Sequence, residues 1–214
     1  MTSPALAIRR LGLTDYRQAL EAMRTFTAVR KPGQTSELWL VEHPPVFTLG
    51  QAGKAEHLLN PGRIPVVQSD RGGQVTYHGP GQLVCYMLLN LDEAGIGIRS
   101  LVERTEEALI RLLASEDIAA TRREGAPGVY TDTAKIAQIG LRVKRHNTYH
   151  GLSLNIDMDL EPYARINPCG YEGLAATQLR DCTDRPVSLP EARAALLKRL
   201  ADLLGYNGIR DHEH

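Results

Sequence analysis

The chain has 214 residues, of which 43% are hydrophobic, so it can bury the core of one domain, expected over residues 1–214. The chain has 25 basic residues (Lys and Arg) and 25 acidic residues (Asp and Glu). Its net charge is therefore not positive, and the composition does not favour binding to nucleic acid. No run is long and apolar enough for a membrane span, and the first ten residues lack the apolar core of a secretion signal, so we expect no membrane attachment.

The first half of the sequence predicts one helix followed by strands. The helix is expected from Thr14 to Val29, because Thr14 is a residue type that often precedes a helix. Short apolar or alternating segments bounded by glycine, proline and polar residues then indicate strands. These strands are expected at 38–41, 46–49, 66–68, 74–77 and 83–91.

The second half adds two helices and more strands. Ser100-Leu101-Val102-Glu103 is typical of a capping box that opens a helix, and Ser188-Leu189-Pro190-Glu191 opens another, expected at 189–204 before Gly205. Further strands are expected at 128–131, 135–143 and 149–157. Strands outnumber helices and do not alternate regularly with them, which favours an α+β fold. We expect a mixed, mostly antiparallel sheet with flanking helices and a core at about 30–180.

A thiol lies in a turn at Asn167-Pro168-Cys169-Gly170. Pro168 has a fixed φ and disfavours a helical conformation for Asn167 before it, and Gly170 permits the close approach of a substrate. The pattern therefore predicts that Cys169 is a nucleophile. The alternative is that Cys169 is a buried and inert thiol, as free cysteines usually are.

Lys135 begins an apolar strand and is a candidate partner for this thiol. A neighbouring cation stabilises a thiolate, and a buried lysine exchanges its proton more readily than an exposed one. Pairing of the two side chains is therefore a hypothesis. The alternative is that the Lys135 ammonium group extends to solvent.

Glycines and two basic side chains are concentrated in Arg71-Gly72-Gly73-Gln74-Val75-Thr76-Tyr77-His78-Gly79-Pro80-Gly81-Gln82. Backbone N–H groups, with Arg71 and His78 as further donors, suit an acyl carbonyl or an oxyanion. The segment lacks the Gly-Lys-Ser/Thr of a phosphate-binding loop. A simple turn with His78 hydrogen-bonded inside it is the alternative. Polar residues and a glycine also enter the strand at 147–157.

Taken together, Arg71 to Gln82, Lys135 to Gly140, His150 to Asn155 and Pro168 to Gly173 resemble the lipoyl(octanoyl) transferase family. The resemblance extends from Trp39 to Gly173. It implies the fold of the catalytic domain of biotin and lipoate protein ligases. It also implies transfer of an octanoyl group from octanoyl-acyl carrier protein to a lysine of lipoyl domains through an acyl-cysteine thioester, the first step of endogenous protein lipoylation.

The resemblance also assigns roles to individual residues. Cys169 corresponds to the acyl-thioester nucleophile, and Lys135 to the residue that activates the thiol and acts as acid and base. The remaining matched positions correspond to the segments that bind the acyl group. They are Arg71, Gly72, Gly73, Gln74, Val75, Thr76, Tyr77, His78, Gln138, Ile139, Gly140, Gly151, Leu152 and Ser153.

The expected partners are octanoyl-acyl carrier protein, the lipoyl domains of 2-oxoacid dehydrogenase complexes and the glycine cleavage H protein. These partners are acidic, and the basic clusters 122–123 and 142–145 either dock them or are solvated. No cofactor is expected, because transfer from a thioester to an amine needs no nucleotide. Scattered histidines and cysteines without C-x-x-C spacing argue against a metal, and the odd number of cysteines favours a reducing, cytoplasmic location. Without a heptad pattern, we expect a monomer.

Overall fold

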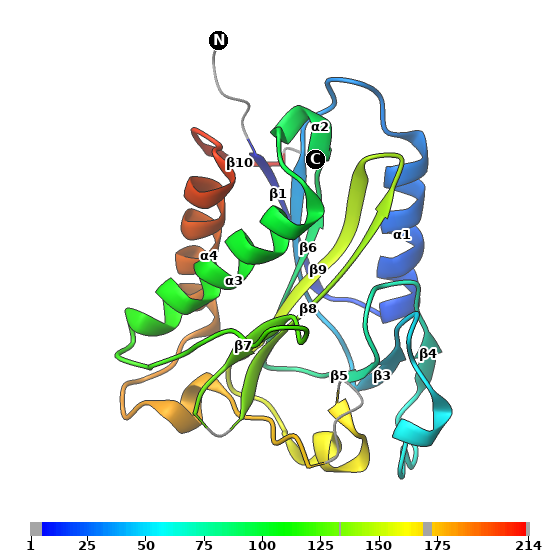
Figure 1. Cartoon of the computed structure of the whole chain (residues 1–214), viewed down its shortest axis with the longest axis vertical. Coiled ribbons are helices and arrows are strands. Elements are labelled where there is room, and N and C mark those ends of the chain that lie inside the picture. Colours follow the sequence, from blue (N-terminus) through cyan, green and yellow to red (C-terminus); the bar gives the residue numbers. More distant parts are fainter. Residues whose placement is uncertain (1–5, 133, 169–172, 213–214) are drawn as a thin grey trace.

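The computed structural model describes residues 6–132, 134–168 and 173–212, and Figure 1 shows a central sheet with helices on both sides. Within these ranges the main sheet has seven strands in the order β10-β1-β2-β6-β9-β8-β7. Strand β1 pairs in parallel with β2 and β10, whereas the other neighbours in this sheet are antiparallel. The α+β prediction of a mixed, mostly antiparallel sheet with flanking helices is therefore confirmed.

The strands of the main sheet are β1 (Leu6–Leu13), β2 (Glu37–Glu42), β6 (Gln82–Leu88), β7 (Gly128–Tyr130), β8 (Lys135–Lys144), β9 (Asn147–Asn155) and β10 (Ile209–Asp211). A smaller sheet contains β3 (Val46–Leu49), β4 (Val66–Gln68) and β5 (Val75–His78). The helices are α1 (Tyr16–Val29), α2 (Leu91–Ala94), α3 (Ile98–Ala114) and α4 (Leu189–Leu204).

Alternation along the strands gives the main sheet two apolar faces. Val84 and Tyr86 of β6 pack with Met23 and its neighbours in α1, whereas Cys85 and Met87 belong to the cluster that includes the apolar residues of α3 and α4. This arrangement follows from the period of two in a strand, which sends neighbouring side chains to opposite faces. Figure 1 accordingly shows α1 on one side of the sheet and α3 with α4 on the other.

The helix starts differ in part from those expected. Helix α1 begins one residue after Asp15, whose carboxylate accepts hydrogen bonds from the backbone N–H groups of Arg17 and Gln18, so Asp15 is the cap in place of Thr14. The capping box at Ser100 is wrong, because α3 already begins at Ile98 and Ser100 lies inside it. The prediction for α4 is confirmed, since Ser188 accepts a hydrogen bond from the N–H of Glu191 and Gly205 ends the helix.

Three further features differ from the sequence expectations. The strand expected at 83–91 ends at Leu88, because Asn90 caps the short helix α2. Strands β1 and β10 were not predicted, and the core extends beyond 30–180, because Leu6 and Leu196 are fully buried in the main cluster.

Across the described ranges, no helix combines the length and the apolar character needed to cross a membrane.

Candidate active site

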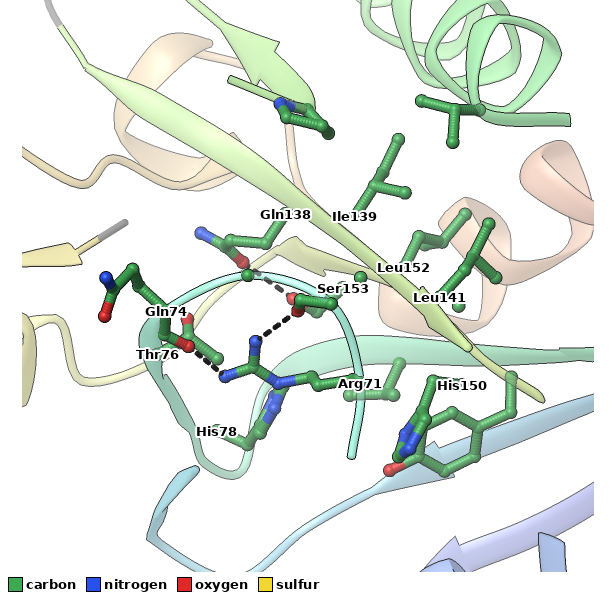
Figure 2. A pocket seen from close by; sticks show the side chains of 18 of the residues that line it. Arg71, Gln74, Thr76, His78, Gln138, Ile139, Leu141, His150, Leu152 and Ser153 are labelled. Carbon is green, nitrogen blue, oxygen red and sulfur yellow. Dashed lines mark hydrogen bonds between the residues drawn. The ribbon is translucent and has the colours of Figure 1, made fainter. Parts of the chain in front are cut away.

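The glycine-rich loop between β4 and β5 is fixed to the edge of the main sheet. The N–H of Gly72 donates to the carbonyl oxygen of Leu141 in β8, at 2.9 Å. Arg71 is buried, and its guanidinium donates to the carbonyl oxygens of Thr48 (2.7 Å), Gln74 (2.8 Å) and Gly72 (3.0 Å). Figure 2 shows Arg71 within the arc of the loop. Because these acceptors are protein groups, Arg71 holds the loop against β3 and shapes the site.

Two glycines that face each other on neighbouring strands allow this close packing. Gly140 of β8 pairs with Gly151 of β9. A Cβ atom at Gly151 would lie 2.1 Å from the carbonyl oxygen of Cys85, and one at Gly140 would lie 3.0 Å from that of Gly72. Any larger residue would push β6 away from β9, or the loop away from β8.

A cavity of about 400 Å³ lies where the loop, β8 and β9 meet, a size typical of small-molecule sites. Every residue that the sequence predicts to bind the acyl group lies on its wall except Tyr77, and Lys135 lies there too. Tyr77 packs instead against the rings of Phe47 and Tyr163, at centroid distances of 5.5 and 5.6 Å. Thr76 and His78 lie on the cavity wall on either side of Tyr77, whose side chain points to the opposite face of β5 as alternation requires, and Val75 at the start of β5 lies on the wall as well.

Apolar side chains form the other part of the wall. Figure 2 shows Ile139, Leu141 and Leu152 together on one side of the β8 ribbon, with Arg71, Thr76 and His78 on the other side. Ile98 and Val102 of α3 complete the apolar part. The sequence did not indicate these two residues, because only the fold brings α3 to the cavity.

His78 lies in a fixed hydrogen-bond network. Its Nδ1 is 2.7 Å from Oε1 of Gln82, and Nε2 of Gln82 donates to Oδ1 of Asn155, which fixes the orientation of the amide. Burial, with a smaller contribution from His43, lowers the pKa of His78 well below its usual value. The ring is therefore neutral, Nδ1 carries the proton, and Nε2 can only accept. This differs from the donor role that the sequence suggested for His78.

Asp70, which precedes the glycine-rich loop, connects it to β9. Its carboxylate accepts hydrogen bonds from Nε2 of His150 (2.8 Å) and Oη of Tyr149 (2.7 Å). Burial alone would raise the pKa of Asp70, but the bonds from His150 and Tyr149 and the charge of Arg24 outweigh it and hold that pKa below its usual value. No local pattern indicated this contact, because the partners are far apart in the chain. His150 also lies on the cavity wall.

Lys135 is buried, with 2% of its surface exposed, so it does not extend to solvent. Its Nζ donates to the carbonyl oxygen of Pro127 at 2.9 Å and lies 5.0 Å from the centroid of the Tyr130 ring. Cys169 lies outside the described residues, so its distance from Lys135 is not part of the structure. The chain that follows Cys169 does return to Lys135, because the N–H of Lys135 donates to the carbonyl oxygen of Ala175.

Comparison with known proteins agrees with this site. Residues 15–201 match the family model of the lipoyl protein ligase A/B catalytic domain. An octanoyltransferase from Pseudomonas putida (strain GB-1) is 60% identical over 204 residues, which cover 95% of this chain and 94% of that protein. The chain belongs to the octanoyltransferase family. An octanoyltransferase from Azotobacter vinelandii is 58% identical, with 94% and 92% of the two chains covered. The protein is therefore an acyltransferase with a lipoate-related function.

Solved structures share the fold of this octanoyltransferase at low sequence identity. A lipoate-protein ligase A bound with ATP superposes with a TM-score of 0.77 at 17% identity, covering 100% of this chain and 89% of the ligase. A biotin protein ligase from Aquifex aeolicus gives a TM-score of 0.56 at 14% identity, covering 96% and 70%. The expected fold, that of biotin and lipoate protein ligase catalytic domains, is therefore confirmed.

The described part of the octanoyltransferase contains no group of three or more His, Cys, Asp or Glu side chains that could hold a metal ion. Its histidines His43, His78 and His150 are buried instead. Burial is the largest cause that lowers the pKa of each of these three rings.

Because the pKa of each of these three histidines is lowered in the folded protein, we expect the octanoyltransferase to lose stability in mild acid. Each has a lower pKa when folded than the usual value of about 6.5, so below pH 6.5 the unfolded chain binds more protons than the folded one. The contribution of these neutral histidines to the free energy of unfolding is complete above pH 6.5. Below that pH, the free energy of unfolding falls by up to about 1.4 kcal/mol per pH unit for each histidine. Urea unfolding at pH 7.5 and 5.5 measures this loss.

The variant His78→Gln should reduce this pH dependence by about one proton. Equal stability of the wild type at both pH values would contradict the assignment of neutral, buried rings. Asp70 does not enter this comparison, because a lowered carboxylate pKa affects stability only below about pH 4.

Proposed function

We propose that this octanoyltransferase moves an octanoyl group from octanoyl-acyl carrier protein to a lysine of a lipoyl domain through a thioester on Cys169. The observation that carries the proposal is a buried lysine, Lys135, on the wall of a largely apolar cavity. Acyl carriers present an apolar chain that ends in a thioester, and the cavity offers apolar walls with a polar region for the carbonyl group. The close octanoyltransferase relatives support the acyl group.

In the first half-reaction the Cys169 thiol gives its proton to Lys135, and the thiolate attacks the thioester carbonyl carbon. A new C–S bond forms, the bond to the carrier sulfur breaks, and the carrier thiolate takes the proton back from Lys135. Backbone N–H groups of the glycine-rich loop are candidates for stabilising the oxyanion, because they are already fixed by Arg71.

In the second half-reaction the amine of the lipoyl-domain lysine attacks the acyl-Cys169 carbonyl. A C–N bond forms, the C–S bond to Cys169 breaks, and the proton lost by the amine passes through Lys135 to the Cys169 thiolate. The product is an amide, and the enzyme returns to its starting state. A thioester is converted to a more stable amide, so the balance needs no nucleotide.

A ligase that activates a free acid with ATP is the alternative within the same fold, because the lipoate-protein ligase A neighbour was solved with ATP. A non-catalytic acyl-binding module is the other alternative. The buried Lys135 favours the transferase over a binding module, since a module has no need for a buried ammonium group beside its acyl site. Identity near 60% to octanoyltransferases favours it over the ligase.

Incubation with octanoyl-acyl carrier protein without ATP should raise the mass of the intact enzyme by one octanoyl group. Peptide mapping should place the group on Cys169, and hydroxylamine should remove it, as it does for a thioester. A parallel incubation with free octanoate and ATP is the control. With a lipoyl domain added to both samples, octanoylation of that domain only in the ATP sample would indicate a ligase, and no octanoylation and no adduct in either sample would indicate a binding module.

The cytoplasmic location, the monomeric state and the docking of acidic partners stay predictions. Of the basic residues considered for docking, Arg122 is engaged by Glu107 at 2.7 Å and Arg123 lies over the Tyr130 ring at 4.3 Å. Lys144 and Arg145 are exposed at the β8–β9 turn. Arg122 and Arg123 thus contact other side chains of the protein, whereas Lys144 and Arg145 face solvent. The cluster 142–145 is therefore the better candidate for docking an acidic partner protein.

A further inference from the structure

The peptide group between Pro127 and Gly128 is held by charged side chains at both ends. Its N–H, from Gly128, donates to Oε1 of Glu106 at 3.1 Å, and its carbonyl oxygen, from Pro127, accepts from Nζ of Lys135 at 2.9 Å. Both groups belong to one planar unit. A carboxylate on α3 and the ammonium group of Lys135 are thus joined across a single peptide dipole, with the favourable sign at each end.

This arrangement is buried. Glu106 is 5% exposed and Lys135 is 2% exposed. The backbone of β7 packs directly on the lysine stem, because a Cβ atom at Gly128 would lie 2.6 Å from Cε of Lys135. In such surroundings each hydrogen bond is stronger than in water, and the two polarise one another through the shared peptide.

Other charged and titratable groups face this arrangement from the neighbouring elements. Nε of Arg122 lies 3.8 Å from Oε2 of Glu106, which offsets part of the cost of burying the carboxylate. Arg122 also pairs with Glu107, the next residue of α3. The Tyr130 ring lies beside Nζ of Lys135, and Arg123 lies over that ring. Cys169 is outside the described residues.

We propose that Glu106 is a positioning residue for Lys135 and acts through the Pro127–Gly128 peptide. The proposal rests on the acid and base role given above to Lys135. Pro127 and Lys135 both lie on the cavity wall, so the peptide held by Glu106 is part of the acyl site. Glu106 fixes Nζ at this wall and favours the protonated lysine, which keeps the proton available for the leaving carrier thiolate.

The variant Glu106→Gln tests the charge while keeping the shape, because the amide oxygen can still accept from Gly128. We expect kcat to fall about tenfold with KM nearly unchanged, and the basic limb of the pH–rate profile, where the protonated Lys135 is lost, to move about one pH unit lower. The titration of Lys135 is followed separately by NMR of its Cε and Nζ atoms. The other lysines to be resolved are Lys31, Lys54, Lys144 and Lys198. The Lys135 signal should also titrate at lower pH in the variant.

Glu107→Gln is the matched control, because Glu107 is on the same helix and binds the same Arg122, whereas the N–H of Gly128 donates to Glu106. It should change neither the pH profile nor the Lys135 signal. If Glu106→Gln does not fold, Glu106→Asp replaces it, and its retained charge should keep the Lys135 titration near that of the wild type while kcat falls.

An unchanged Lys135 titration in folded Glu106→Gln would overturn the proposal. A shifted titration with an unchanged pH–rate profile would instead support the coupling of Glu106 to Lys135 and contradict the acid and base role of Lys135. The NMR readout does not depend on turnover, so the two failures are distinguishable.

Discussion

Replacing Cys169 by alanine should abolish octanoyl transfer and the acyl-enzyme adduct, because none of the described residues on the cavity wall carries another thiol. Serine at this position is expected to be equally inactive, since an alcohol is far less ionised than a thiol near neutral pH. The measurement is mass spectrometry of the intact variant after incubation with octanoyl-acyl carrier protein, together with transfer to a lipoyl domain.

Cys85→Ala is the matched control, because it removes a thiol that the structure places in the core. Cys85 is fully buried in β6, and burial raises the pKa of its thiol to about 12, so it is not a nucleophile near neutral pH. The variant should lose about 1 kcal/mol of stability and keep its activity. A folded Cys85→Ala protein without activity, beside an active Cys169→Ala protein, would show that the nucleophile is misassigned.

Lys135→Arg should be nearly as damaging as Lys135→Ala, because a guanidinium carries positive charge but does not release a proton at physiological pH. The two half-reactions separate the effects. Arginine should allow some acylation of Cys169 by stabilising the thiolate, but the acyl-enzyme should then accumulate, because the attacking amine must lose a proton. Rapid-quench measurement of the adduct and of the amide product follows both steps.

The larger arginine side chain must also fit a crowded site, where the backbone at Gly128 touches the lysine stem. Lys135→Met, which keeps the length of the stem without a charge, separates packing from chemistry. It should preserve the thermal unfolding temperature better than arginine and form almost no adduct. Full turnover by the arginine variant would contradict the acid and base role of Lys135.

Local patterns predicted the elements whose structure depends on local interactions. The strand expected at 46–49 has those bounds, and Ser188 and Gly205 delimit α4 as expected. The start of α3 could not be predicted in this way, because Gly97 offers no side-chain cap and the helix is fixed by packing of Leu101 and Leu109 in the core. Strand β10 is exposed, and its pairing with β1 depends on residues about 200 positions earlier.

For the site, the sequence identified the segments but not the way in which they are held together. The glycine-rich loop and the residues of β8 and β9 could be recognised by type and resemblance. Asp70, Glu106 and Ile98 could not, because each acts through a contact with a segment far away in the chain. Tyr77 shows the reverse, since its place within a matched segment did not indicate which way its side chain points.

Two apolar residues of the cavity wall come from an element that carries none of the polar groups on that wall. The polar groups come from backbone and side chains of the glycine-rich loop, β8 and β9, which are bound to one another by hydrogen bonds. Ile98 and Val102 reach the cavity from a helix that takes no part in those bonds. Substitutions at Ile98 and Val102 can therefore change which acyl chains fit, as long as Glu106 on the same helix keeps its hydrogen bond to Gly128. Among related enzymes that prefer acyl chains of different length, we expect sequence differences at the positions of Ile98 and Val102 in α3.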